Sequence, residues 1–237
     1  MLTEFLNLGR QPIANGFLNP QNLPEREFLY NLRIGFDENT GIVSQMSTVK
    51  PEMMFNERYP YRCGLSKTMV KHFSDFSRSL RKHFNNNKLK ILEIGSNDGT
   101  FLKSWNTNEA IGIEPCKNFC KETNNLGYTT YDDFWTQETA DKVINNHGKF
   151  DIIFSANCMC HIENLDEVFS AVSSSLSKKG LFIFEDPSLK CTIQNNSYDQ
   201  FYDEHVHLFS VYSLSNILRD HGLKIVKVDN LAKDLQK

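Results

Sequence analysis

The sequence predicts an α/β protein in which a doubly wound, mostly parallel sheet follows an irregular N-terminal arm. Between residues 89 and 184, four short apolar runs alternate with amphipathic helical patterns, and such runs are typical of strands buried on both faces of a parallel sheet. The first 62 residues are instead rich in Asn, Pro, Tyr and Phe and show no long helical period. We therefore expect one α/β domain with an appended arm.

Length and composition agree with this organisation. The chain has 237 residues, of which 40% are hydrophobic and 23% charged, enough for a buried core. The formal net charge of −3 provides no field that would attract nucleic acid or anionic lipid. No apolar run approaches the roughly 20 residues that span a bilayer, and the N-terminus lacks a signal-peptide pattern. We expect a cytoplasmic protein that binds neither nucleic acid nor membranes.

The first elements in chain order are a short strand and a long helix. Residues 28–36 have the composition of a strand within the arm. From Ser66 onward, apolar residues recur every three or four positions, as Met69, Phe73, Phe76 and Leu80. This spacing predicts an amphipathic helix that ends in the Asn85–Asn87 loop. We place the boundary between the arm, residues 1–65, and the α/β domain, residues 66–237.

The apolar runs of the domain are expected to form its sheet. They cover residues 89–94, 110–113, 150–156 and 181–184, and a weaker strand at 128–131 lies between the second and third. A helical pattern over residues 165–176 separates the last two runs. Because parallel neighbours require right-handed crossovers, this alternation predicts a Rossmann-like doubly wound sheet.

Two elements are expected after the fifth strand. Residues 213–219 have a helical pattern that His221 and Gly222 would close. Residues 224–228 alternate in a way that predicts a last strand.

The strongest functional signal is the turn after the first buried strand. The strand runs straight into Gly95, and a second glycine follows at Gly99, so the backbone can turn tightly and approach a ligand closely. A dinucleotide fingerprint starting at Gly95 would need glycine at positions 97 and 100, which are Asn97 and Thr100 here. A nicotinamide-dependent oxidoreductase is therefore the disfavoured rival.

The remaining pattern resembles the first motif of class I S-adenosylmethionine-dependent methyltransferases. Its residues are Glu93, Gly95, Asn97 and Gly99. This cofactor has no pyrophosphate to neutralise, so acidic and amide groups can hydrogen-bond its amino-acid part. Glu114, followed by Pro115, ends the second strand, where a carboxylate can accept both ribose hydroxyls. A plain structural role for Glu93, as a turn stabiliser, is the alternative.

By the same resemblance, later strand ends contribute to the cofactor site. Asp132, Asp133 and Phe134 follow the third strand, where such enzymes usually clamp the adenine. Asn157 follows the fourth strand. The two aspartates are equally compatible with a solvated loop.

Further stretches narrow the resemblance to the bacterial sugar C-methyltransferases of deoxysugar biosynthesis. These stretches are residues 7–15, 59–61 with 66–69, 93–99 and 202–205. They run in the family's order over nearly all of the chain. The resemblance implies transfer of a methyl group from S-adenosylmethionine to a keto-sugar carried on a nucleotide, with S-adenosylhomocysteine as the product. Surface-polysaccharide or other deoxysugar-type biosynthesis is the setting that we expect.

The resemblance also implies an acid–base site. A base removes a proton beside the ketone, and the resulting enolate attacks the sulfonium methyl. His205 matches the position of that base, and imidazole titrates close to operating pH. Glu204 and Tyr202 are expected to hold substrate hydroxyls or to orient the imidazole, and Tyr61 to close the site from the arm.

Several of these residues have a structural alternative. His161 lies directly beyond the fourth strand, at the same end of the sheet, where a histidine is either catalytic or a satisfied structural residue. Tyr59 and Tyr61 are compatible with packing of the arm onto the core, and His207 with a neighbour of the base that has no role of its own.

The chain departs from the sugar methyltransferases in two places. Family members typically begin with a zinc-binding arm whose second cysteine pair lies just before a glycine, but here Thr40 precedes Gly41 and no cysteine is nearby. Because Thr40 cannot replace a thiolate ligand, we expect no zinc and an arm that holds together by packing. Family members also continue into a second α/β domain, whereas this sequence ends at Lys237.

These departures leave the acceptor open. We expect a methyltransferase that acts on an activated sugar or a related polar small molecule. Without the second domain the acceptor could be smaller than a nucleotide-sugar, and the same base could deprotonate a hydroxyl for O-methylation. A non-catalytic partner protein that keeps the cofactor-binding fold is the third alternative. The oligomeric state does not follow from the sequence.

Overall fold

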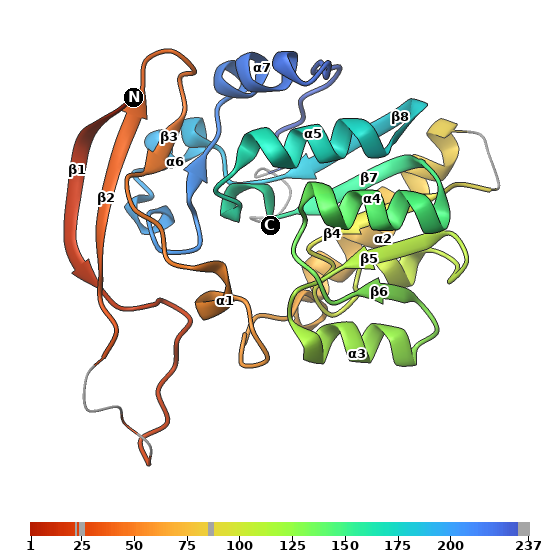
Figure 1. Cartoon of the computed structure of the whole chain (residues 1–237), viewed down its shortest axis with the longest axis horizontal. Coiled ribbons are helices and arrows are strands. Elements are labelled where there is room, and N and C mark those ends of the chain that lie inside the picture. Colours follow the sequence, from red (N-terminus) through yellow and green to blue (C-terminus); the bar gives the residue numbers. More distant parts are fainter. Residues whose placement is uncertain (22, 24–26, 85–87, 232–237) are drawn as a thin grey trace. The chain divides into compact units, whose positions relative to one another are not determined.

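The computed structural model describes residues 1–21, 23, 27–84 and 88–231 and divides into two compact units (Figure 1). The first unit comprises residues 1–60, 155–165 and 184–217, and the second comprises residues 61–154, 166–183 and the chain from 218 onward. The expected loop at Asn85–Asn87 and the end of the chain at Lys237 lie outside the described residues.

A five-stranded sheet forms the core of the second unit. Its spatial order is β6 (Thr129–Tyr131), β5 (Ala110–Ile113), β4 (Ile91–Ile94), β7 (Phe150–Ala156) and β8 (Leu176–Glu185). Strand β4 pairs in parallel with β5, and β5 with β6. All five strands lie where the apolar runs predict them, so the expected Rossmann-like, mostly parallel sheet is confirmed.

The order of the strands locates the ligand-binding edge of this sheet. Within this sheet, the central strand β4 comes first in the sequence. Strands β5 and β6 follow on one side of it, and the chain then crosses to β7 on the other side. In doubly wound sheets, ligands bind at the carboxyl ends of the strands where the order reverses. The segment that follows β4 at this reversal contains Gly95 and Gly99.

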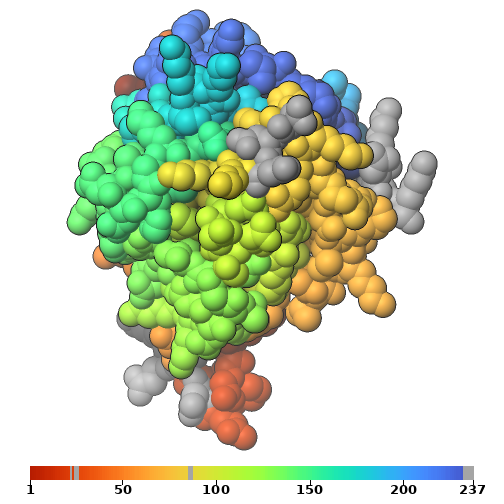
Figure 2. All heavy atoms as spheres, turned by 90° about the vertical axis from the view of Figure 1, so that its right-hand side faces the viewer, coloured from red at the N-terminus to blue at the C-terminus, as the bar shows by residue number. Residues whose placement is uncertain are grey.

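Helices alternate with these strands as predicted. They are α2 (Lys67–Phe84), α3 (Lys117–Asn125), α4 (Gln137–His147) and α5 (Leu165–Ser175). Helix α2 buries Phe73, whose ring packs edge-on against Phe101 and Phe154 at centroid distances of 5.8 and 5.7 Å. Residues between β4 and α4, yellow-green to green in Figure 2, form a closely packed surface.

The first unit contains a second sheet, which the expected irregular arm with short strands did not include. Strands β1 (Leu2–Gln11), β2 (Tyr30–Asp37), β3 (Val43–Gln45) and β9 (His207–Leu208) form an antiparallel sheet in that order. Strand β2 was predicted, but the ten-residue β1 was not. Its pairing shifts register twice, between Glu4 and Leu6 and between Asn7 and Arg10, so its apolar residues do not alternate regularly.

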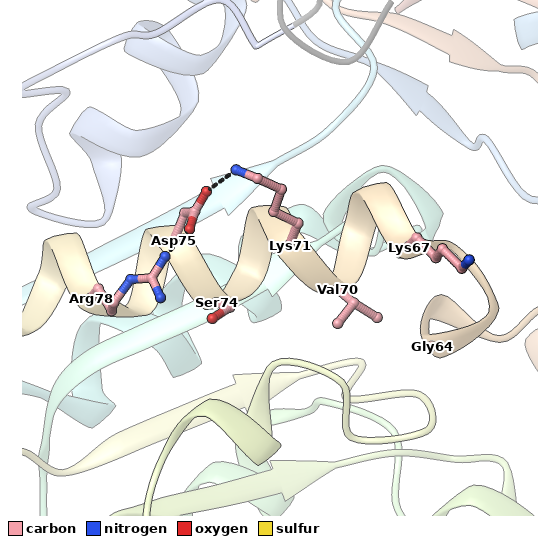
Figure 3. A pocket seen from close by; sticks show the side chains of 7 residues that line it. All are labelled: Gly64, Lys67, Val70, Lys71, Ser74, Asp75 and Arg78. Carbon is pink, nitrogen blue, oxygen red and sulfur yellow. Dashed lines mark hydrogen bonds and ion pairs between the residues drawn. The ribbon is translucent and has the colours of Figure 1, made fainter. Parts of the chain in front are cut away.

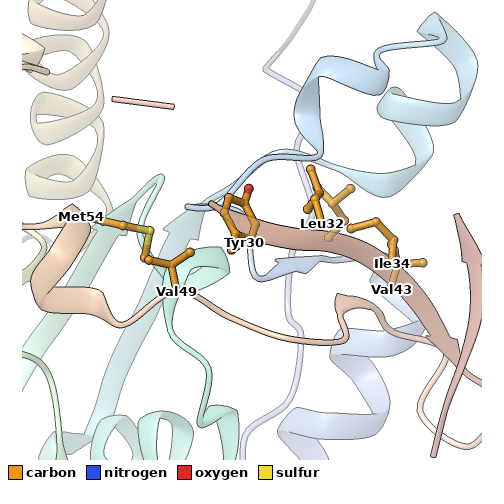
Figure 4. Close-up of a cluster of buried hydrophobic side chains, with 7 residues drawn as sticks. Tyr30, Leu32, Ile34, Val43, Val49 and Met54 are labelled. Carbon is orange, nitrogen blue, oxygen red and sulfur yellow. The ribbon is translucent and has the colours of Figure 1, made fainter. Parts of the chain in front are cut away.

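An apolar cluster holds this sheet together (Figure 4). Its buried members are Tyr30, Leu32, Ile34, Val43, Val49, Met54 and Leu208. Val49 and Met54 come from the segment that ends in the short helix α1 (Pro51–Met54), whereas Leu208 comes from β9 near the other end of the chain. The cluster therefore packs sequence-distant parts of the first unit against one another.

The C-terminal part of the described chain agrees only partly with the sequence. After the short helix α6 (Leu189–Asn195), helix α7 (Val211–Asp220) forms as expected, and Gly222 follows it with a φ of 69°. The strand predicted at residues 224–228 is wrong, because these residues belong to no strand and Val226 is 70% exposed. Alternating polar and apolar residues favour a strand, but a strand also requires a neighbouring strand to accept its hydrogen bonds.

Candidate functional site

The turn after β4 has the backbone geometry that its glycines predict. Gly95 and Gly99 have φ angles of 73° and 74°, in the left-handed region that glycine adopts without strain. A Cβ on Gly99 would also lie 2.6 Å from Cγ2 of Thr123. Asn97, with a φ of 48°, occupies the same region, which asparagine tolerates better than most residues.

Glu114 fixes this turn from the end of β5. One carboxylate oxygen accepts a hydrogen bond from the Asn97 N–H at 2.6 Å, and the other accepts one from the Cys116 N–H at 2.8 Å. Burial raises the pKa of Glu114, and the two backbone donors act in the opposite direction. Each oxygen keeps a second lone pair, so the carboxylate can still accept hydroxyl groups of a ligand.

Glu93 lies on β4, directly before the turn, and its carboxyl group is buried with an unused oxygen. Oε2 of Glu93 has no hydrogen-bond partner, and neither has Oγ of Ser96 in the turn. Burial raises the pKa of Glu93 well above its usual value, and the nearby carboxylates of Glu114 and Asp98 raise it further. The turn therefore contains acceptors that suit a cationic ligand group.

The end of the arm, residues 61–64, is hydrogen-bonded to the turn. The Asn97 side chain donates to the carbonyl oxygen of Tyr61 at 3.0 Å and accepts from the Cys63 N–H at 3.0 Å. Asp98 accepts from the Gly64 N–H at 2.9 Å. These contacts place Tyr61 beside the glycine turn, with a ring that is 45% exposed. Burial of the hydroxyl raises the pKa of Tyr61 to about 12.

The residues expected around the adenine lie beyond β6 and are more open. Asp132 is exposed, and Asp133 forms an ion pair with Lys142 at 2.9 Å. Phe134 is half-buried, and its carbonyl oxygen accepts a hydrogen bond from Thr139 at 2.9 Å. Pro115, after β5, is also half-buried.

In the first unit, hydrogen bonds hold the neutral His205 imidazole in one tautomer. Nδ1 lies 2.9 Å from the carbonyl oxygen of Gln200, which can only accept, so the neutral ring carries its proton on Nδ1. The lone pair on Nε2 then accepts a hydrogen bond from the hydroxyl of Tyr202 at 3.2 Å. Burial lowers the pKa of His205, which keeps the imidazole neutral near pH 7. The ring is therefore a preformed proton acceptor.

Glu204 is held by the arm and does not contact this imidazole through a hydrogen bond that the structure shows. Its carboxylate accepts from the Tyr59 hydroxyl at 2.8 Å and from the Asn15 side chain at 2.5 Å. Asp203 accepts from the Ala14 N–H at 3.0 Å. The Asp203–Glu204 pair thus fastens the segment before β9 to the arm.

His161 stacks between two rings. Its ring lies 5.4 Å from that of His205 and 5.4 Å from that of Phe55, with interplanar angles of 21° and 16°. Burial lowers the pKa of His161 to about 3, and its buried Nε2 has no hydrogen-bond partner.

Asp186 is a site residue that sequence reasoning missed. It follows β8 and accepts hydrogen bonds from the N–H groups of Cys158 and Cys160, each at 3.1 Å. Burial raises the pKa of Asp186 to about 7. Asn157, at the start of the same loop, is exposed and adopts a φ of 49°. The only sequence signal for Asp186 is its place directly after a strand.

A separate pocket runs along α2 in the second unit (Figure 3). It is lined by Gly64, Lys67, Val70, Lys71, Ser74, Asp75 and Arg78. Asp75 forms ion pairs with Lys71 and Arg78 there. None of the site residues expected from the sequence lines this pocket.

Comparison with known proteins identifies the family. A family model described as a methyltransferase domain matches residues 67–228. The chain belongs to this methyltransferase domain family. The protein named C-methyltransferase NovU, from Streptomyces niveus, is 25% identical over 229 residues, which are 95% of this chain and 54% of that protein. The chain thus spans about half the length of this curated relative.

Solved methyltransferase structures resemble the chain in fold. The plantazolicin methyltransferase BamL, solved with S-adenosylhomocysteine (SAH), is 15% identical, with a TM-score of 0.51 over 65% of this chain and 62% of that one. The magnesium protoporphyrin IX methyltransferase of Synechocystis, also with SAH, is 16% identical, with a TM-score of 0.48 over 68% and 75%. The expected class, a class I S-adenosylmethionine-dependent methyltransferase, is confirmed.

A second family model, described as a putative zinc-binding domain, matches residues 1–55 of this methyltransferase. Zinc in proteins is bound mainly by cysteine thiolates and histidine nitrogens. Residues 1–55 contain neither cysteine nor histidine. The residues of this segment therefore do not fit a structural zinc ion, although the segment matches the model.

None of the described helices of the methyltransferase has the length and apolar content needed to cross a membrane.

Proposed function

We propose that this protein transfers the methyl group of S-adenosylmethionine to an activated sugar or a related polar small molecule, with His205 as the general base. The observation that carries the proposal is the preformed imidazole, whose Nδ1–H is directed at the Gln200 carbonyl and whose Nε2 keeps its lone pair. The cofactor supplies an electrophilic methyl group on a sulfonium ion.

The second unit provides the cofactor-binding residues in this proposal. The unpartnered Glu93 carboxyl oxygen accepts from the ammonium group of the cofactor, and Glu114 accepts from the ribose hydroxyls while it holds the turn. Gly95, Asn97 and Gly99 keep the turn open to the ligand. The further proposed cofactor contacts are Pro115, Asp132, Asp133, Phe134 and Asn157.

His205 removes a proton from the acceptor in this proposal. The acceptor atom that keeps the electron pair would then receive the methyl group as the sulfur–methyl bond breaks and S-adenosylhomocysteine leaves. The proton arrives at Nε2 while Nδ1–H stays bonded to Gln200, so the imidazolium that forms is stabilised by the carbonyl dipole. Tyr202, at 3.2 Å from Nε2, orients the ring or binds the acceptor. His161 contributes to the acceptor site, and Glu204 keeps Tyr202 and His205 in place through the arm. Tyr61 is a further proposed catalytic residue.

A carbon atom beside a ketone is the proposed acceptor. The similarity to a protein named C-methyltransferase, over 95% of this chain, supports carbon over oxygen. We propose a nucleotide-linked keto-sugar as the substrate class and deoxysugar or surface-polysaccharide biosynthesis as the setting.

The arm, residues 1–65, holds its fold without zinc in this proposal and acts as the lid on the acceptor. Support comes from the apolar cluster around Ile34 and from the lack of cysteine and histidine in residues 1–55. The methyltransferase domain then covers residues 66–237.

The test is methyl transfer from S-adenosylmethionine with a deuterated methyl group to nucleotide-linked 4-keto-6-deoxy sugars, followed by mass spectrometry and NMR of the product. We expect His205→Ala to lower turnover by about 10²–10⁴-fold, the usual contribution of a general base, and to leave cofactor binding unchanged. The exposed His83→Ala is the matched control and should keep full turnover. Full activity of His205→Ala would refute the base, and a methyl group on oxygen would refute the carbon acceptor.

A further inference from the structure

Three side chains of metal-ligand type meet in the first unit. The short turn Met159–His161 and the segment before β9 bring Cys160, His161 and His205 together, and one ligand atom from each lies within 4.8 Å of the others. Among the residues that the structure describes, this is the one group of three that meets such a criterion. Cys160 and His205 are buried.

The buried nitrogen of His161 is the second observation. Nε2 has no hydrogen-bond partner, and the ring stacks between Phe55 and His205. An unsatisfied buried polar atom destabilises the fold, so such atoms call for a physical explanation, and a bound ion or water is a common one. A metal ion bound to this nitrogen would remove this destabilisation.

Contacts around the three side chains are those that support metal ligands. His205 donates its Nδ1–H to the carbonyl oxygen of Gln200, an outer contact that metal-binding histidines usually make. On the other side, Asp186 accepts from the N–H groups of Cys158 and Cys160 and thereby fixes the turn that carries Cys160 and His161.

We propose that Cys160, His161 and His205 form a binding site for a thiophilic divalent cation, and that Zn²⁺ fits it best. One sulfur and two imidazole nitrogens are ligands that Zn²⁺ prefers, and three protein ligands leave a fourth position for water or an acceptor oxygen. With zinc–ligand distances of about 2.0–2.3 Å, tetrahedral ligand atoms lie about 3.4–3.8 Å apart. The side chains therefore close by about 1 Å when the ion binds.

The site has a consequence for catalysis that rests on the proposed function. The lone pair of His205 cannot bind a metal ion and accept a proton at the same time. Bound Zn²⁺ therefore inhibits methyl transfer by occupying the base. The metal site itself depends only on the three side chains and does not require that His205 be catalytic.

Co²⁺ is the probe for binding, because a thiolate bound to Co²⁺ gives a near-ultraviolet charge-transfer band. The full chain, reduced and free of metal, is titrated with CoCl₂ and then with ZnSO₄ as competitor. We expect one Co²⁺ per chain with this band, and displacement by one equivalent of Zn²⁺. Cys160→Ser should lose the band and bind at least about tenfold more weakly, since loss of an outer partner alone costs 10–100-fold. Cys191→Ser, a matched change in α6 outside the group, should retain both.

Absence of the band in the wild-type chain, or its persistence in Cys160→Ser, would overturn the site whatever the enzyme's activity. His161→Ala separates the ligand set from a lone thiol: weaker binding supports the site, and unchanged binding overturns it. If Co²⁺ binds as expected, Zn²⁺ should inhibit methyl transfer with the affinity measured in the titration. Full turnover of the zinc-loaded protein would overturn the inhibitory role and leave the binding site standing.

Discussion

At the scale of single residues, two buried acidic side chains at the glycine turn are the proposed cofactor contacts. Glu93 and Glu114 are 3% and 4% exposed, yet they differ in their partners. Each Glu114 oxygen accepts a hydrogen bond from a backbone N–H group, whereas Oε2 of Glu93 has no partner. Glu93 is therefore the carboxyl group whose charge state a cationic ligand can change.

This difference predicts release of a proton on cofactor binding. The raised pKa favours the protonated form of Glu93 in the ligand-free protein, and a bound cofactor ammonium would lower that pKa by stabilising the carboxylate. Isothermal titration at pH 7 in buffers of different ionisation enthalpy should reveal about one proton released per cofactor. In Glu93→Gln the release should vanish.

Glu109→Gln is the control, since Glu109 is also buried but pairs with Arg81 at 3.0 Å, and the pKa of Glu109 is lowered. It should leave the proton release unchanged. A binding enthalpy that does not depend on the buffer in the wild-type protein would contradict the account.

The pKa of Glu93 also affects stability. Because the folded-state pKa lies above the unfolded value of 4.5, the folded protein binds more protons than the unfolded chain between these two values. The free energy of unfolding should therefore decrease as pH rises through this window. Glu93→Gln should make the urea midpoint less dependent on pH there, and an equal dependence in both proteins would be inconsistent with a buried, protonated Glu93.

At the scale of elements, an apolar core stabilises the first unit. The family model that matches residues 1–55 is instead described as a putative zinc-binding domain. Ile34 on β2 is 1% exposed and belongs to the cluster with Leu32 and Val43. Ile34→Ala should lower the free energy of unfolding by about 2–5 kcal/mol, the usual cost of such a truncation. Leu23→Ala, at a position that is 64% exposed, should change it by less than about 0.5 kcal/mol. Similar midpoints for the two variants in urea unfolding would show that the cluster does not hold the arm.

A helix cap provides a smaller effect in the second unit. The side chain of Thr136 accepts a hydrogen bond from the Thr139 N–H at 3.2 Å at the start of α4. Thr136→Ala should cost about 1 kcal/mol, whereas Thr136→Ser should cost much less because it retains the acceptor. Thermal unfolding of the two variants checks this prediction, and equal melting temperatures would exclude a capping role.

The elements also show what the sequence can predict. Strands β5 and β7 have the predicted bounds because continuous apolar runs between polar turns admit few alternatives. Strand β1 escaped prediction because two register shifts break its alternation. Residues 224–228 alternate well, but no neighbouring strand pairs with them, and pairing is a long-range property that a local pattern cannot reveal.

For the candidate site, the sequence predicts residue types at strand ends but not their partners. The turn with Gly95 and Gly99 was visible in the motif. The link from Asn97 to Tyr61 and Cys63, and the link from Glu204 to Asn15, join residues far apart in the chain and depend on the folded backbone. Asp186 carries no motif at all.

At the scale of the whole molecule, the proposed donor and acceptor residues fall into different units. Most of the proposed cofactor contacts belong to the second unit, whereas His161, Tyr202 and His205 belong to the first. The match to the methyltransferase domain covers residues 67–228 and so includes both sets of residues. The central claim is that the second unit binds S-adenosylmethionine at the glycine turn, because methyl transfer to any acceptor depends on this binding.

Isothermal titration of the full chain with S-adenosylmethionine and S-adenosylhomocysteine tests that claim most directly. We expect saturable binding at one site per chain. Glu114→Ala removes the acceptor of two buried N–H groups and of the ribose hydroxyls, so it should weaken binding at least about tenfold, or about 1.4 kcal/mol. The exposed Glu57→Ala should bind like the wild-type protein. Absence of binding to the folded wild-type chain, or undiminished binding to Glu114→Ala, would contradict the account.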